Sequence, residues 1–176
     1  IIVVSDFAKQ GFANTIYEAV NSATGEKQNV SAKGPIDVVN YCFNSYEAVD
    51  LDIDLEHSFN FLLVSQWSVR KNFENSICWF LEEFIDQKVG LVIKASFAKN
   101  SHIDFLRSKM AIEKILMNPK YANRKCSVHL VHGYMSDKEM ASLYQHPKIK
   151  ALVNIAHGEG FGLPILESAA TGLPVI

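Results

Sequence analysis

Apolar and polar positions alternate along the chain in a way that predicts strands followed by helices. Short apolar runs suited to buried strands occupy residues 1–4, 36–39, 59–65, 89–93, 128–131 and 149–155. Between most of these runs, apolar side chains recur at three, four and seven residues, which is the spacing of one face of a helix. Strands that alternate with helices predict an α/β fold, in which a mainly parallel sheet is covered by helices on both faces.

Local signals indicate how the N-terminal part of this pattern is organised. Ser5 is expected to cap a first helix that keeps its apolar spacing through Ile16 and Val20. Residues 21–35 are rich in Ser, Gly, Asn and Lys, which is typical of a loop. The acidic residues 46–57 are expected to be irregular.

The remaining helices have their own start signals. Asn72 is expected to cap a helix with a core-facing apolar stripe, and residues 103–116 have the pattern of another. Ser136 and Glu139 have the spacing of a capping box, which predicts a helix start. Pro164 at a first helical position opens the last predicted helix.

Length and composition limit the classes of protein. The 176 residues suffice for one domain with a core, and 48% hydrophobic with 20% charged residues is typical of a soluble globular protein. A net charge of −2 with scattered Lys and Arg argues against a nucleic-acid partner. No apolar run reaches the roughly 20 residues of a membrane span. Because the chain starts within one apolar run and stops where another begins, we expect it to be a piece of a longer protein.

The cysteines and the acidic and histidine clusters do not predict a metal site. Cys42, Cys78 and Cys126 are widely spaced among apolar neighbours, which indicates reduced core thiols in a cytoplasmic protein. The Asp-x-Asp pattern at residues 50–54 lacks the glycine and the twelfth-position glutamate of a calcium loop. His129 and His132 are three residues apart on a predicted strand and therefore point to opposite faces.

The strongest chemical signal is a glycine-rich segment that joins the last predicted strand to the last helix. It comprises His157, Gly158, Glu159, Gly160, Phe161, Gly162, Leu163, Pro164, Ile165, Leu166 and Glu167. Glycines let the backbone approach a ligand closely, and amide groups at a helix start bind phosphate. In the alternative, purely structural interpretation, the glycines only form a tight turn and Glu167 complements the helix dipole in the first turn.

The segment also resembles a known signature. Glu159 and Glu167 are separated by seven residues, and the run continues into Gly172, Leu173, Pro174 and Val175. This arrangement closely resembles the signature of family 4 of the retaining glycosyltransferases, which have the GT-B architecture. The order of the preceding elements agrees over nearly the whole chain. The resemblance implies that residues 1–176 form an incomplete, Rossmann-like, C-terminal nucleotide-sugar-binding domain, without the N-terminal acceptor domain and the final C-terminal elements.

The resemblance also implies roles for individual residues. The donor would be a nucleotide diphospho-sugar, with no metal and no further cofactor. Glu167 would bind the ribose hydroxyls, and Glu159 would contact the transferred sugar near its anomeric carbon. Lys71 with Arg70 would neutralise the departing nucleoside diphosphate. The backbone of Gly160, Phe161, Gly162 and Leu163 would hold the diphosphate, with Gly158 and His157 beside it.

One departure from the family pattern concerns phosphate binding. Ser65 and Gln66 stand where many members carry a glycine and an arginine. Either Arg70 supplies the missing charge or the phosphate contact is weaker. Lys94, which follows the fourth strand, is a second-rank candidate, and the role we expect for it first is to extend its ammonium group from the edge of the core to the surface.

The resulting functional hypothesis is sugar transfer, with retention, to a hydroxyl of a glycan or lipid-linked acceptor in polysaccharide biosynthesis. The acceptor would bind mainly to the N-terminal domain, in the cytoplasm, and peripheral membrane association of the complete enzyme is compatible with this hypothesis. Two alternatives stay open, namely a nucleotide-sugar epimerase of the same architecture and a non-catalytic nucleotide-binding module.

Overall fold

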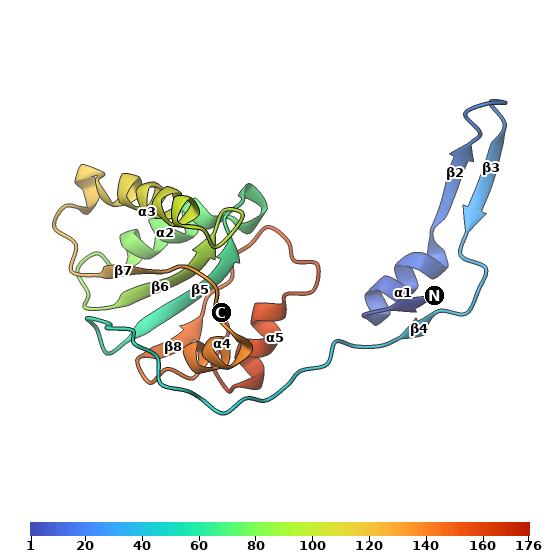
Figure 1. The fold of residues 1–176 in the computed structure, drawn as a ribbon. Coiled ribbons are helices and arrows are strands. Elements are labelled where there is room, and N and C mark those ends of the chain that lie inside the picture. Colours follow the sequence, from blue (N-terminus) through green and yellow to red (C-terminus); the bar gives the residue numbers. More distant parts are fainter. The chain divides into compact units, whose positions relative to one another are not determined.

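The computed structural model describes residues 1–176, which divide into two compact units, Ile1–Phe43 and Asn44–Ile176 (Figure 1). In the first unit, β1 (Ile2–Val3) pairs in parallel with β4 (Asp37–Val38). Helix α1 (Asp6–Asn14) follows Ser5, whose hydroxyl accepts the Ala8 amide as predicted. Val3 is the one buried apolar side chain of this unit, so its fold has almost no core of its own.

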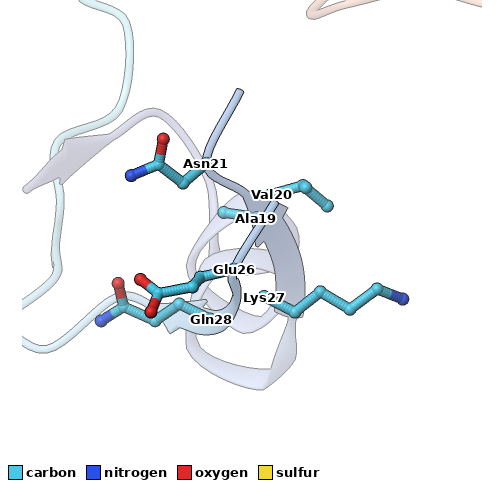
Figure 2. Close-up of a pocket in the computed structure, with 6 residues that line it drawn as sticks. All are labelled: Ala19, Val20, Asn21, Glu26, Lys27 and Gln28. Atoms are coloured by element: carbon cyan, nitrogen blue, oxygen red, sulfur yellow. The ribbon is translucent and has the colours of Figure 1, made fainter. Parts of the chain in front are cut away.

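The rest of the first unit differs from the sequence prediction. The helix ends at Asn14, and β2 (Ile16–Val20) forms an antiparallel hairpin with β3 (Lys27–Ser31) inside the predicted loop. Ile16 and Val20 are β-branched and favour a strand. The Asn21 side chain accepts two amides of the turn, and Gly25 takes a positive φ of 74°, which closes the hairpin. A shallow hollow at this end is lined by exposed side chains (Figure 2).

The second unit contains the alternating strands and helices that the pattern predicted. Its elements are β5 (Asn60–Gln66), η1 (Val69–Lys71), α2 (Phe73–Glu83), β6 (Gly90–Ser96), α3 (His102–Leu116), η2 (Pro119–Tyr121), β7 (Ser127–Val131), α4 (Asp137–Tyr144), β8 (Ile149–Leu152) and α5 (Leu163–Ala170). The capping box of α4 is formed by Ser136 and Glu139 as predicted. None of the helices is both long enough and apolar enough to cross a bilayer.

The sheet of this unit confirms the predicted α/β class. Its strands lie in the order β7-β6-β5-β8, all neighbours are parallel, and Val175 makes a further parallel bridge to Leu152 of β8. Counted along the chain from β5, this is the order 3-2-1-4-5 of a doubly wound, Rossmann-type sheet. The strand order reverses between β5 and β8, and ligands of such sheets bind at the carboxyl ends of the strands at that point.

Helices cover both faces of the sheet, and a core lies on each (Figure 1). Leu63 and Ile93 pack with Phe73 and Ile77 of α2, whereas their neighbours Leu62 and Val92 point to the opposite face. That opposite face packs against α4 and α5. This alternation is the reason for the nearly continuous apolar runs of β5 and β6, because both faces of each strand are buried.

Several local predictions need correction. Asn72 directly precedes α2, but its side chain makes no capping hydrogen bond with the helix. Strand β8 ends at Leu152 rather than at residue 155. Cys126 and, in part, Cys78 are buried, but Cys42 is exposed and is not a core thiol. Residue 42 lies in an irregular segment, where apolar neighbours in sequence do not imply burial.

Gly90, at the start of β6, is tightly enclosed. A Cβ atom there would lie 1.8 Å from Oδ1 of Asn60, whose buried amide donates to the carbonyls of His57 and Lys148. We expect Gly90→Ala to lower the free energy of unfolding by about 2–5 kcal/mol, since it overpacks the core and displaces buried hydrogen bonds. Urea denaturation measures this change. Gly158→Ala, where no atom lies within 4 Å, is the control. An equally stable Gly90→Ala variant would contradict the prediction.

Candidate functional site

The connections β5–α2 and β8–α5 are joined at the carboxyl ends of their strands. The His157 amide donates to the Arg70 carbonyl over 2.9 Å, and the Arg70 guanidinium donates back to the Gly158 carbonyl. The Asn72 side chain donates to the Ile155 carbonyl over 3.1 Å. These contacts bring together two predicted site segments that are 88 residues apart in the chain.

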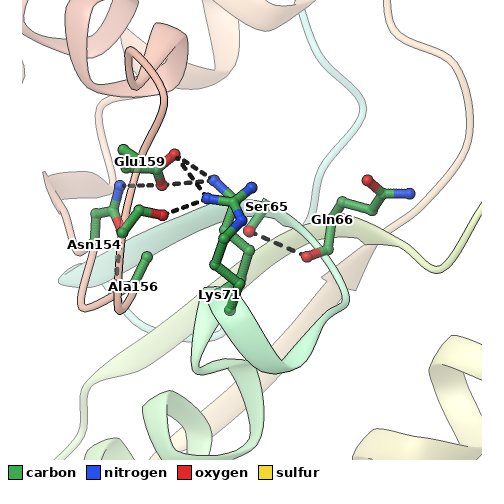
Figure 3. A network of polar contacts seen from close by, with 8 residues as sticks. Ser65, Gln66, Lys71, Asn154, Ala156 and Glu159 are labelled. Carbon is green, nitrogen blue, oxygen red and sulfur yellow. Dashed lines mark hydrogen bonds and ion pairs between the residues drawn. The ribbon is translucent and has the colours of Figure 1, made fainter. Parts of the chain in front are cut away.

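The centre of this junction is an ion pair between Lys71 and Glu159 (Figure 3). The ammonium group lies 2.6 Å from Oε1 of the glutamate and also bonds Oε2. Asn154 donates to the same Oε1 over 3.0 Å, and Arg70 lies 3.8 Å from Oε2. The side chains of Lys71 and Glu159 are only 14% and 22% exposed, so the pair is partly shielded from water.

These neighbours determine the ionisation of Glu159. Burial raises the pKa of its carboxyl, but hydrogen bonds from Lys71 and Asn154 and the charges of Lys71 and Arg70 outweigh burial and lower the pKa below its ordinary value. The corresponding contribution to stability is therefore present above the pKa of the unfolded chain and is lost as the pH falls through the folded value. Glu159 is a carboxylate at neutral pH.

A pocket of about 570 Å³ lies along the carboxyl ends of β5 and β6, next to this ion pair. Its lining comprises Val64, Ser65, Gln66, Lys71, Lys94, Ala95, Ser96, Ala98, Met140 and Pro164. The volume is in the range of small-molecule and cofactor sites. Lys71 and Lys94 supply its positive charge, whereas Arg70 is not part of the lining.

Two of the lining residues are held by the surrounding loops. Burial lowers the pKa of Lys94, whose ammonium group donates to the Gly133 carbonyl. Lys94 is therefore half-buried at the pocket, with its ammonium group held by the Gly133 carbonyl. The Gln66 side chain donates to the Phe97 carbonyl over 3.0 Å, so it is turned toward the β6–α3 loop.

The glycine-rich turn leads directly into α5. Gly162 adopts a positive φ of 80°, and its carbonyl accepts the amides of Ile165 and Leu166. The amides of Gly160, Gly162 and Leu163 donate to no group of the chain. Phe161 and Leu163 are exposed at 37% and 45%. Unused amides at a helix start are suited to an anion, so phosphate binding by this turn stays a prediction.

Glu167 lies apart from the ion pair, in the second turn of α5. Its Oε2 accepts the Tyr144 hydroxyl over 2.9 Å. Burial, with the charge and hydrogen bond of Glu167, raises the pKa of Tyr144. The purely structural interpretation placed Glu167 in the first turn of the last helix. That placement is wrong, because α5 begins at Leu163 and has no acidic residue in its first turn. Tyr144 fixes one carboxylate oxygen and leaves the other able to accept.

Sequence reasoning missed three residues that shape the site. Asn154 and Tyr144 hold the two glutamates, and Asp104 accepts the amides of residues 97, 98 and 99 in the β6–α3 loop. Burial raises the pKa of Asp104, but these bonds and nearby His132 lower it overall. Ser101 and Asp104 have capping-box spacing, which was an available signal. Nothing in the sequence distinguishes Asn154 or Tyr144.

The acidic and histidine residues form no cluster of three or more that could hold a metal ion. Residues 50–54 lie in the irregular segment before β5. His132 is buried, with Nε2 3.7 Å from a carboxylate oxygen of Asp104. The His132 side chain is therefore packed inside the fold and does not line the pocket.

Asn72 has an unusual backbone conformation for a residue with a side chain. Its φ is 52°, the one positive value outside glycine, and it directly follows Lys71. We expect Asn72→Ala to be less stable than Asn72→Gly by about 1–2 kcal/mol, because both lose the amide but only glycine accepts this conformation without strain. Urea denaturation of the two variants measures the difference. Equal stabilities would show that the backbone relaxes at this position.

Comparisons with known proteins give a distant structural match. No family model matches the chain, and no curated protein matches it. A solved structure titled "OtsA apo structure" aligns with a TM-score of 0.49 and 14% sequence identity. The alignment covers 66% of this chain and 27% of that chain, so the present chain spans about a quarter of its length.

Proposed function

We propose that this chain binds a nucleotide diphospho-sugar at the carboxyl ends of β5 and β8 and belongs to a retaining, metal-independent glycosyltransferase. The observation that carries the proposal is the Lys71–Glu159 pair, which lies at the strand-order reversal beside a pocket of about 570 Å³. The resemblance of residues 157–176 to glycosyltransferase family 4 supports the reaction type.

The geometry suits each chemical task of such a reaction. Departure of a nucleoside diphosphate is favoured by positive charge at the place where the negative charge develops. Lys71 lines the pocket and would supply this charge. The amides of Gly160, Gly162 and Leu163 are available to the diphosphate. Glu159, an ionised carboxylate bonded to Lys71, would contact the transferred sugar.

The remaining parts of the donor have their own partners in this proposal. Glu167 would bind the ribose through the carboxylate oxygen that Tyr144 leaves available. Lys94 would add positive charge within the pocket, where Gln66 replaces an arginine. The acceptor hydroxyl, on a glycan or a lipid-linked sugar, would be bound by a domain outside this chain.

The test is a binding and product screen with the complete protein. Calorimetry with UDP, GDP and ADP and their diphospho-sugars, in EDTA, is expected to show one nucleotide series that binds. Lys71→Ala should weaken this binding, whereas Lys120→Ala, which removes the exposed Lys120–Glu82 pair, should leave it unchanged. NMR of the product should show transfer with retained anomeric configuration.

Each other outcome identifies a different function. A released epimer of the sugar would indicate an epimerase of the same architecture. Binding without consumption of any donor, in the presence of varied acceptors, would indicate a non-catalytic module. Failure of every nucleotide to bind would overturn the proposal.

A further inference from the structure

We propose that Asn154 is a positioning residue that keeps the Glu159 carboxylate aimed at the sugar when the donor diphosphate draws Lys71 away. This inference rests on the proposed function. It adds a residue that lies outside the glycine-rich segment and outside the pocket lining, and that contacts Glu159.

The two ends of the Asn154 side chain have different partners. Its Oδ1 accepts the Ala156 amide over 3.1 Å, and its Nδ2 donates to Oε1 of Glu159 over 3.0 Å (Figure 3). An amide N–H requires an acceptor and a carboxylate requires a donor, so these partners define the orientation of the side-chain amide. The first contact closes a turn just after β8 and the second holds Glu159.

The backbone of Asn154 is anchored independently of its side chain. Its amide donates to the Ile176 carbonyl over 2.9 Å, beside the parallel bridge between Leu152 and Val175. The backbone of Asn154 is therefore tied to the chain segment beside β8, whereas Glu159 lies on the glycine-rich loop. A hydrogen bond from a residue with an anchored backbone to a loop side chain is the arrangement expected of a residue that positions another.

The need for such a residue follows from the ion pair. Lys71 bonds both oxygens of Glu159, and a bound diphosphate competes for the same ammonium group. Lys71 is therefore a partner that Glu159 must share during the reaction. Asn154 is neutral and already has both of its contacts, so a phosphate does not attract it as a charge, and it remains with Glu159.

Asn154→Ser tests the role with little change to the turn. A serine hydroxyl can still accept the Ala156 amide, but it is too short to reach Glu159. With the donor selected by the nucleotide screen, we expect kcat to fall about tenfold, the effect of one hydrogen bond in the transition state. The Kd for the matching nucleoside diphosphate should stay within about twofold. Asn29→Ser, on the exposed hairpin strand β3, is the matched control.

A double variant shows whether the effect passes through Glu159. If it does, Asn154→Ser combined with Glu159→Gln should be no slower than Glu159→Gln alone. Losses that multiply, or an unchanged kcat in Asn154→Ser, would overturn the inference. If Glu159→Gln itself keeps full turnover, the proposed function of the site fails first, and the two failures are thereby distinguished.

A second readout needs no turnover at all. Asn154→Asp keeps the acceptor for Ala156 but places a second carboxylate about 3 Å from Glu159. The pKa of Glu159, followed by carboxyl ¹³C NMR and assigned with Glu159→Gln, should rise in this variant and be unchanged in Asn29→Asp. An unmoved pKa would show that the Asn154 contact is not made in solution and would overturn the inference by itself.

Discussion

Lys71→Ala is expected to lower turnover by a factor of about 10²–10³, the usual effect of removing one group that stabilises charge in the transition state. Lys71 is the cation that lies both in the pocket lining and in contact with Glu159. Arg70 is less suited to this role, since its side chain is 57% exposed, lies outside the pocket lining and donates to the Gly158 carbonyl. Steady-state kinetics in the complete protein measure the change.

Stability should change far less than turnover in this variant. The Lys71–Glu159 pair is only partly buried, and Glu159 keeps Asn154 as a partner when the lysine is removed. We expect a loss of about 1 kcal/mol in the free energy of unfolding. Lys120→Ala removes a comparable ion pair, 2.6 Å long, between η2 and α2 and should leave turnover unchanged. Near-normal turnover in Lys71→Ala would mean that another group, with Lys94 first to be tested, carries the charge.

The parallel sheet was predictable because its strands are buried on both faces. Runs such as residues 59–65 and 89–93 are apolar at successive positions, which only a doubly covered strand requires. The hairpin of the first unit was not predictable in the same way. Ile16 and Val20 fit both a helical spacing and an alternating one, and the unit has almost no core to select between them. Local strand preference and the Asn21 turn decided the outcome there.

The residues of the candidate site were likewise predictable only in part. Residues on the glycine-rich turn and at Arg70 and Lys71 carry a chemical signal in their type and spacing. The partners that hold them do not, because their role depends on which strand lies beside which. Tyr144 reaches Glu167 from another helix, and Asn154 meets Glu159 only because the chain turns back after β8. Such contacts follow from the three-dimensional fold and leave no mark at a fixed sequence distance.

The two glutamates should respond in opposite ways to loss of charge. Glu159→Gln releases Lys71 from its ion pair, so the affinity for a nucleoside diphosphate should stay the same or increase. Under the proposed function the chemical step should slow strongly, because the carboxylate that would contact the transferred sugar is gone. Glu167→Gln leaves Lys71 untouched and keeps an oxygen for the Tyr144 hydroxyl. It should mainly weaken binding of the donor and of the free nucleoside diphosphate, since a ribose contact is made equally in the ground and transition states.

The measurement combines calorimetry of the nucleoside diphosphate with steady-state kinetics for both variants. Both changes are nearly isosteric and lie on a loop and a helix at the surface, so folding should be preserved, and thermal unfolding checks this. Tyr144→Phe provides an independent arm, because it frees Glu167 without changing its charge. Its effect should resemble a weaker Glu167→Gln, with reduced affinity and nearly normal kcat. If Glu159→Gln lost nucleotide affinity while Glu167→Gln kept it, the ribose contact would belong to the loop glutamate, and the competition for Lys71 inferred from the ion pair would be wrong.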